Sequence, residues 1–400
     1  MYPTESAQLL VNASVVLRNS VEKVSVLIEG GIIRALDPIS TSHAQKVDLQ
    51  GRFLIPGLVD LHCDALEKEV EPRPGVSFPA LFACQQADRR NAAAGITTIY
   101  HSLSFANHEL GVRNNVFARQ LCETVAHWNQ HALVDNRIHA RYEITDATAP
   151  EHLRSLMESG CAQMISFMDH TPGQGQVKDI EAYRSFLMRT YNKSQDEFEQ
   201  ILLDKQAASV DAMRRVESLA EIARSRGIAI ASHDDDQPGK VDLLKALGAS
   251  ISEFPINMET ALHASRSGLA TLFGAPNILR GKSQSGSMKA LDAVLADVAD
   301  CLCGDYSPAA LLPAAFRLVQ LSHLTLPQAI ALVSVNPARA AGLNDRGEIA
   351  AGKRADLVAV LAQGDWPQIE TVWCSGRRVF SIAAASIGAL ADSVEIPEHA

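Results

Sequence analysis

The feature that most constrains the fold is a series of eight short apolar segments that alternate with helical stretches. The segments are residues 57–64, 95–103, 137–144, 162–169, 227–233, 248–254, 268–275 and 300–305. Strands that alternate with helices favour a parallel sheet, because each parallel connection crosses over the sheet. Eight such units over roughly 250 residues predict an α/β fold, a (β/α)8 TIM barrel with catalytic residues at the carboxyl ends of its strands. A doubly wound open sheet is the alternative, but the sequence has no GxGxxG turn to support it.

Short β segments rich in Val, Ile and Leu flank this region at both ends of the chain. They occupy residues 1–55 and 345–385, and neither end alone can bury its apolar face. We therefore predict a small β-sandwich domain built from both chain ends, around a barrel at 56–344 and followed by a tail at 386–400. A charged helical insertion at about 177–226 is predicted either to cover the barrel mouth as a lid or to pack at its periphery.

Charge and cysteine usage exclude several classes of function. The net charge of −10 disfavours nucleic acid or an anionic membrane as the main partner. The seven cysteines form no CxxC pair, which favours a reducing cytoplasm. No stretch of about 18 apolar residues offers a membrane span, and no signal peptide is visible. We expect a cytoplasmic homo-oligomer whose partner is a small molecule rather than a nucleic acid or a membrane.

Metal-ligand residue types stand at the ends of five predicted strands. The candidate ligands are His62, Asp64, Glu143, His170, His233 and Asp305. His62 and Asp64 are two apart on a strand, so they share a face and can reach one ion together. Mixed imidazole and carboxylate ligands suit a divalent ion, zinc first and then Mn, Fe or Ni. The number of ligands predicts two ions bridged by Glu143, and Asp305 is the candidate to orient a water and move its proton.

Other polar residues near the strand ends have simpler interpretations. Asp234–Asp236 are predicted to be turn or helix-entry residues, since Asp is common at the start of a helix. His101 ends the second predicted strand and is either a substrate contact or a packing residue. Cys303 is predicted to pack in the core.

Cations gather in two loops close to the predicted metal site. The candidate substrate-binding residues are Lys68, Arg73, Arg280, Lys282, Ser283 and Ser285. Backbone N–H groups, hydroxyls and cations in a Gly-rich loop can hold phosphates. These loops therefore predict a phosphorylated substrate, with an ordinary polar barrel loop as the alternative for the second cluster.

The sequence also resembles a known family. LIPGLVDLHxD and GEIAAGKRADLV are similar to motifs of the amidohydrolase superfamily. DLHCDALEKEVEPRPGV, ISFMDHTPGQ, FGAPNILRGKSQSG and GDYSPAALLPAAFR resemble the PhnM family of the carbon–phosphorus lyase pathway, over about residues 10–380. The resemblance implies a metal-dependent enzyme of phosphonate catabolism that hydrolyses α-D-ribose 1-methylphosphonate 5-triphosphate to the 5-phosphate and pyrophosphate. It also implies the same six metal ligands.

Two other functions remain open from the sequence. One is hydrolysis of a C–N bond in a cyclic amide or an aminopurine. The two cationic loops argue against it, because a neutral substrate needs no positive charge for binding. The other is a non-catalytic binding subunit of a phosphonate-degrading assembly. This second alternative stays open because His62 and Asp64 form a His-x-Asp where the superfamily usually has His-x-His.

Overall fold

The described strands of this protein form three sheets, of eight, six and four strands. The computed structural model describes residues 6–107, 113–169, 184, 194–196, 198–200, 203, 211–283, 287–363 and 366–382. None of the described helices is long and apolar enough to cross a membrane.

The eight-stranded sheet is a parallel barrel in which every strand neighbours the next one along the chain. Its strands are β8 (Leu58–Cys63), β9 (Ile96–Phe105), β10 (Asp135–Glu143), β11 (Met164–Met168), β12 (Ala229–His233), β13 (Ile251–Glu253), β14 (Ala270–Gly274) and β15 (Cys301–Cys303). A parallel bridge between Cys63 and Asp305 joins the first strand to the end of the last. The predicted TIM barrel is confirmed, and each of the eight predicted segments overlaps one of its strands.

Alternation along each strand separates the barrel interior from the surrounding helices. On β10, Ile138, Ala140 and Tyr142 pack in a hydrophobic cluster with residues of the outer helices. The residues between them, His139 and Arg141, therefore point into the barrel. The same period explains how a strand rich in apolar residues brings polar groups to the barrel interior.

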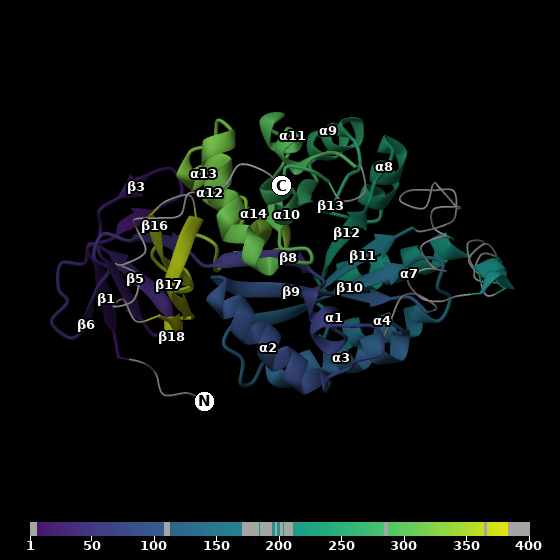
Figure 1. Cartoon of the computed structure of the whole chain (residues 1–400), viewed down its shortest axis with the longest axis horizontal. Coiled ribbons are helices and arrows are strands. Elements are labelled where there is room, and N and C mark those ends of the chain that lie inside the picture. The colour runs from purple at the N-terminus through teal and green to yellow at the C-terminus, as the bar shows by residue number, and fades with distance from the viewer. Residues whose placement is uncertain are drawn as a thin grey trace.

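Helices cover the outside of the barrel, with α2, α3 and α4 on one side and α8 and α9 on the other (Figure 1). The helices are α1 (Ala65–Val70), α2 (Ala80–Ala93), α3 (Asn115–Trp128), α4 (Ala149–Glu158), α7 (Ala212–Ser225), α8 (Pro238–Ala246), α9 (Met258–Arg266), α10 (Ala275–Arg280), α11 (Ala290–Leu295), the short 3-10 helix η2 (Pro308–Ala310), α12 (Leu311–Leu321), α13 (Leu326–Ala331) and α14 (Val335–Ala340). Most of the predicted insertion at about 177–226 lies outside the described residues, so its role as a lid stays a prediction. Its last part forms α7, which packs against α4 as an ordinary barrel helix.

The two smaller sheets confirm the predicted β-sandwich from both chain ends. They contain β1 (Gln8–Val11), β2 (Ser14–Val16), β3 (Val21–Glu22), β4 (Val26–Glu29), β5 (Ile32–Leu36), β6 (Gln45–Asp48), β7 (Phe53–Pro56), β16 (Leu357–Gln363), β17 (Trp366–Cys374) and β18 (Arg377–Ser381). N-terminal β7 pairs with C-terminal β16, so one six-stranded sheet holds both ends of the chain. Figure 1 shows the yellow C-terminal strand β17 among the purple N-terminal strands. Leu10, Val26, Leu357 and Trp373 share the core between these sheets.

The unit boundaries expected at residues 55, 344 and 385 stay predictions. The predicted tail at 386–400 lies outside the described residues.

Candidate active site

A cavity of about 450 Å³ opens at the carboxyl ends of the barrel strands. Among the predicted metal ligands, it is lined by His62, Asp64, His233 and Asp305. These residues lie at the ends of β8 and β12 or within two residues after β8 and β15, as the parallel topology requires. The barrel therefore brings four of the six predicted ligands to one cavity.

His62 lies at the centre of a buried group of imidazoles and carboxylates. Its Nδ1 is 3.3 Å from Oε1 of Glu253, and Nε2 of His139 is 3.7 Å from Oε2 of the same carboxylate. One potential ligand atom from each of these three residues lies within 4.8 Å of the others. Burial, followed by the charge of Arg141, lowers the pKa of His62 well below its ordinary value. The ring is therefore neutral, which is the form that binds a metal ion.

His139 and Glu253 lie beneath the floor of the cavity and are completely buried. Nδ1 of His139 lies 3.1 Å from the carbonyl oxygen of Leu61, which accepts its proton, and Nε2 lies 2.8 Å from the hydroxyl of Ser166. Complete burial raises the pKa of Glu253 well above its ordinary value, and the charge of Arg141 acts in the opposite direction. This buried layer supports His62, because a carboxyl group at one imidazole nitrogen orients the ring and leaves the other nitrogen for a ligand.

A guanidinium group lies beside the predicted ligand His233. Nη2 of Arg141 is 3.3 Å from Nε2 of His233, while Nδ1 of His233 is 2.8 Å from Oδ2 of Asp234. Nε2 is therefore the nitrogen of His233 that faces the guanidinium of Arg141. A metal ion on this nitrogen therefore requires the guanidinium to turn away.

Asp305 and Asp64 lie at the seam where the barrel closes. The N–H of Asp305 donates to the carbonyl of His62 at 2.8 Å, and the N–H of Asp64 donates to the carbonyl of Asp305 at 3.1 Å. Beneath them, buried Asp60 accepts from the N–H groups of His62 and Gly304. Burial, together with the nearby charge of Asp64, raises the pKa of Asp305 to about 7. Asp305 therefore holds and releases a proton near neutral pH, as a proton-transfer group requires.

The backbone is strained around the cavity. Asp234 and Phe254 each follow a barrel strand directly, Asp305 lies two residues after β15, and their φ values are 53°, 52° and 53°. This left-handed conformation costs about 1 kcal/mol or more for a residue other than glycine. The surrounding structure holds these turns in place, and such strain is concentrated at functional sites.

Cations and hydroxyls line the upper part of the cavity. They are Arg113, Arg280, Lys282, Ser283 and Ser287. Arg113 is anchored by Glu67, whose Oε2 lies 2.7 Å from Nε and 2.6 Å from Nη2. Arg280 is exposed and donates to the hydroxyl of Tyr306 at 3.1 Å. The cavity thus combines a floor of imidazoles and carboxylates with a cationic rim.

The remaining predicted site residues lie elsewhere or outside the described residues. Lys68 on α1 and Arg73 in the following loop are exposed and do not belong to the described lining of the cavity. Glu143 is buried at the end of β10, where its Oε1 accepts from the hydroxyl of Thr145 at 2.6 Å. His170 and Ser285 lie outside the described residues. The roles predicted for these residues stay predictions.

Several predicted packing residues can be placed directly. His101 lies inside β9 rather than at its end, and its ring is 2.9 Å from Oδ1 of Asn136, so it is a packing residue. Asp234 and Asp235 form the turn after β12, where buried Asp235 accepts from the hydroxyls of Ser232 and Ser252. Cys303 packs in the core, as predicted.

Sequence reasoning did not assign His139, Arg141, Glu253 and Arg113 to the site. A signal for the first two exists in the sequence. Glu143 was predicted to point to the barrel axis, and period-two alternation places residues 139 and 141 on the same face. Arg113 carries no such signal, because it precedes a helix and its position depends on the ion pair with Glu67.

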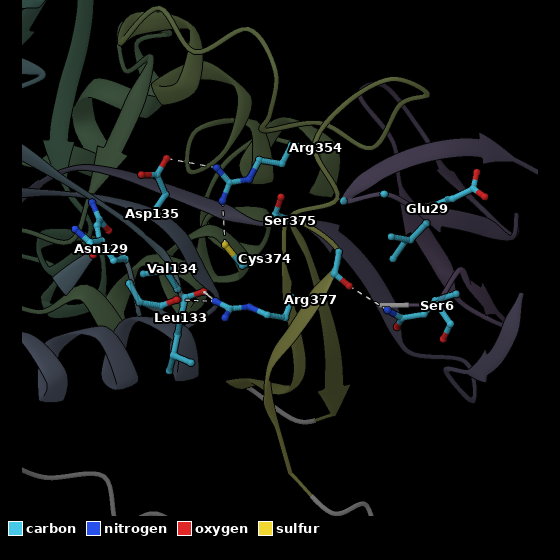
Figure 2. A pocket seen from close by; sticks show the side chains of 17 residues that line it. Ser6, Glu29, Asn129, Leu133, Val134, Asp135, Arg354, Cys374, Ser375 and Arg377 are labelled. Atoms are coloured by element: carbon cyan, nitrogen blue, oxygen red, sulfur yellow. Dashed lines mark hydrogen bonds and ion pairs between the residues drawn. The ribbon is translucent and has the colours of Figure 1, made fainter. Parts of the chain in front are cut away.

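A second pocket, of about 610 Å³, lies between the barrel and the sandwich (Figure 2). Figure 2 shows Arg354 extending between Asp135 and Cys374, with Arg377 directed toward the chain near Leu133. Arg354 is 3.4 Å from Asp135 and 3.0 Å from the Cys374 sulfur, and Arg377 donates to the carbonyls of Ala132 and Leu133. Because these side chains already bind other protein groups, this pocket marks a structural joint.

The donors of the first cavity fit a divalent ion. They combine neutral imidazole with carboxylate oxygens, the ligand types of zinc and related metals. Oδ1 of Asp64 is buried and has no hydrogen-bond partner among the described residues. The chain therefore has a candidate metal-binding cluster at the carboxyl end of its barrel.

Comparison with known proteins agrees with this geometry. The amidohydrolase family profile matches residues 191–379. Dihydropyrimidinase from Brevibacillus agri superposes with a TM-score of 0.61 at 14% identity, covering 94% of this chain and 95% of that one. N-acetylglucosamine-6-phosphate deacetylase from Pasteurella multocida gives the same TM-score at 14% identity, over 93% and 99% of the two chains. These likenesses show that the chain has the fold of the amidohydrolases.

Relatives that are similar in sequence identify the family within the proteins of this fold. Alpha-D-ribose 1-methylphosphonate 5-triphosphate diphosphatase of Escherichia coli K12 is 35% identical over 377 residues, which cover 93% of this chain and all of that protein. Imidazolonepropionase of Deinococcus radiodurans is 25% identical over 371 residues, covering 87% of this chain and 88% of its own. The chain belongs to the family of the ribose methylphosphonate triphosphate diphosphatase.

Proposed function

We propose that this enzyme hydrolyses α-D-ribose 1-methylphosphonate 5-triphosphate to the 5-phosphate and pyrophosphate, as part of phosphonate catabolism. The observation that carries this proposal is that one cavity combines imidazoles and carboxylates that can bind a metal ion with cations that can bind phosphates. Arg113, Arg280 and Lys282 supply three positive charges at the rim, in a protein whose net charge is −10. A triphosphate needs such local charge, whereas a neutral cyclic amide does not.

The proposed ion is zinc, with His62, Asp64 and Asp305 as ligands and His233 joining them when Arg141 turns away. A divalent ion in this position lowers the pKa of a bound water and neutralises charge on a phosphoryl group. Two ions per chain, with Glu143 and His170 completing the set, stay a prediction from the ligand number. Metal analysis of the purified protein gives the stoichiometry directly.

The protein's own residues carry out the remaining tasks. Glu253 holds the His62 ring through Nδ1, so that Nε2 faces the cavity. Asp305 receives the proton of the attacking water, because its carboxyl lies in the cavity beside the other proposed metal ligands. Arg113, held by Glu67, and the loop with Lys282 and Ser283 bind the polyphosphate oxygens.

Phosphorus NMR of the metal-loaded protein with the ribosyl 5-triphosphate tests this proposal. We expect resonances of pyrophosphate and a 5-monophosphate to appear together as the triphosphate disappears. Release of orthophosphate alone would show cleavage of a different anhydride bond. An unchanged triphosphate with metal bound would overturn the proposal and favour C–N hydrolysis, to be tested by ammonia release from cyclic amides and aminopurines.

A further inference from the structure

Arg141 is an unusual side chain for the interior of a barrel. It lies on β10 between the inward positions of His139 and Glu143, and it lines the cavity together with His62 and His233. Its charge lowers the pKa of His62 and His139 and opposes the raised pKa of Glu253 and Asp305. The guanidinium therefore lies within electrostatic reach of the whole cavity floor.

The hydrogen-bond partners of Arg141 do not account for its charge. Within the described part of the chain, its side chain makes a single hydrogen bond, from Nη2 to Nε2 of His233. No described carboxylate lies within 4.0 Å of it, and its Nε is buried without an acceptor. A guanidinium has five N–H donors, so the described residues use only a small part of its hydrogen-bonding capacity.

Two other cations of the cavity, in contrast to Arg141, have a described carboxylate partner or an exposed position. Arg113 is paired with Glu67, and Arg280 is exposed and bound to Tyr306. A guanidinium withdrawn from water without an anion is unfavourable, and an anionic ligand offsets that cost. The position of Arg141 beside the predicted metal ligands, below the rim, determines which part of a ligand it can meet.

We infer that Arg141 binds the phosphoryl group at which water adds, and that it is a catalytic residue of the reaction. This inference rests on the proposed function. Water forms a new P–O bond, the anhydride P–O bond breaks, the bridging oxygen leaves with its electron pair, and a water proton passes to Asp305. Arg141 donates two N–H groups to the non-bridging oxygens of the reacting phosphorus, where charge builds up. The rim residues Arg280 and Lys282 bind the parts of the polyphosphate that do not react.

Two variants of Arg141 and one of Arg280 test the inference. Arg141→Met keeps the length of the side chain and removes its charge, so kcat falls by about 10²- to 10³-fold with metal content unchanged. Arg141→Lys keeps the positive charge but lacks the paired N–H donors of a guanidinium, so we expect a smaller fall in kcat than for Arg141→Met. Arg280→Met at the rim is the matched control, for which we expect a raised KM and a kcat within about threefold of wild type.

Two further measurements separate a catalytic role from a structural one. Because the charge of Arg141 has no described counter-ion, Arg141→Met is expected to melt at the same temperature as wild type or higher. Its affinity for inorganic pyrophosphate, measured by calorimetry on the metal-loaded protein, is expected to fall about tenfold or more. A lower melting temperature with a metal content below that of wild type would overturn the inference in favour of a structural role. A kcat within about threefold of wild type would overturn it outright.

The pyrophosphate titration also separates failure of the proposed function from failure of the proposed contact between Arg141 and the anion. If wild type releases no pyrophosphate from the ribosyl triphosphate, the proposed function fails. A lower affinity of Arg141→Met for pyrophosphate would still support the anion contact. Equal affinity of wild type and Arg141→Met would overturn that contact whatever the substrate.

Discussion

Replacement of Asp135 by Asn tests the joint between the barrel and the C-terminal part of the chain. Asp135 begins β10, and its Oδ2 lies 2.6 Å from Arg346, 3.0 Å from Arg137 and 3.4 Å from Arg354. Arg346 and Arg354 belong to the segment that leads into β16 of the sandwich. The substitution keeps the shape of the side chain and removes the negative charge that these arginines share.

The size of the effect follows from burial. Removing one partner of a buried ion pair costs about 3–5 kcal/mol. The Asp135 side chain is 21% exposed, and Arg346 keeps a second partner in Asp345, so we expect about 2–3 kcal/mol here. An unfolding entropy of about 2.1 cal/mol/K per residue gives roughly 0.8 kcal/mol/K for 400 residues. The apparent Tm of Asp135→Asn is therefore expected to fall by about 3 °C.

The pH dependence of this difference has a definite sign. Burial acts to raise the pKa of Asp135, but Arg137, Arg346 and Arg354 together lower it below its ordinary value of 3.8. The stabilisation from the carboxylate is therefore fully present above pH 3.8 and is lost as the pH falls through the lowered pKa. We expect the full difference between wild type and variant at pH 7 and a smaller one in acid.

Thermal melts followed by circular dichroism at pH 7 provide the measurement. Asp242→Asn is the matched control, because Asp242 pairs with His263 at 2.7 Å while its side chain is 60% exposed. An exposed pair of this kind contributes about 0.5 kcal/mol or less, so this variant should melt within about 1 °C of wild type. Equal melting temperatures for the two variants would refute the reasoning about the buried joint.

Three further predictions concern the site. Asp305→Asn is expected to lower turnover by about 10²-fold or more with metal still bound, and full turnover of the metal-loaded variant would contradict its role in proton transfer. Gly304→Ala places a Cβ against the carboxylate of Asp60 and 2.7 Å from Cα of Pro308; overpacking should cost about 1–3 kcal/mol, and a wild-type Tm would show that the seam relaxes. A chelator is expected to abolish pyrophosphate release and added Zn²⁺ to restore it, whereas turnover of demonstrably metal-free protein would argue against a metal-dependent reaction.

The barrel could be predicted from the sequence because its signal is local. Each strand is a short apolar segment between helical stretches, and the parallel order follows from the crossover connections. The candidate ligands at the strand ends, His62, His233 and Asp305, could be placed at one cavity for the same reason. The sandwich was also predictable, because neither chain end offers enough apolar surface to fold alone.

The deeper part of the site could not be predicted in the same way. Glu253 and His139 lie on different strands, and only closure of the barrel brings them within 3.7 Å of each other. Lys68 and Arg73 were predicted from their nearness to His62 in sequence, but a helix and a turn carry both to exposed positions. Beyond the strand end, helix geometry and loop direction determine where a side chain points, so nearness along the chain does not by itself place these two cations at the cavity.

The seam between β8 and β15 also bears on the order in which the barrel folds. Asp60 and Gly304, which bond across it, are 244 positions apart in the chain. Contacts between such distant residues form late in folding, because the entropy of closing a long loop has to be offset by structure already present. The cavity is therefore complete only when the last barrel strand docks against the first. A chain truncated before β15 would retain most of the barrel helices and yet lack Asp305 and its backbone bond to His62, so we expect an N-terminal fragment of this kind to be inactive.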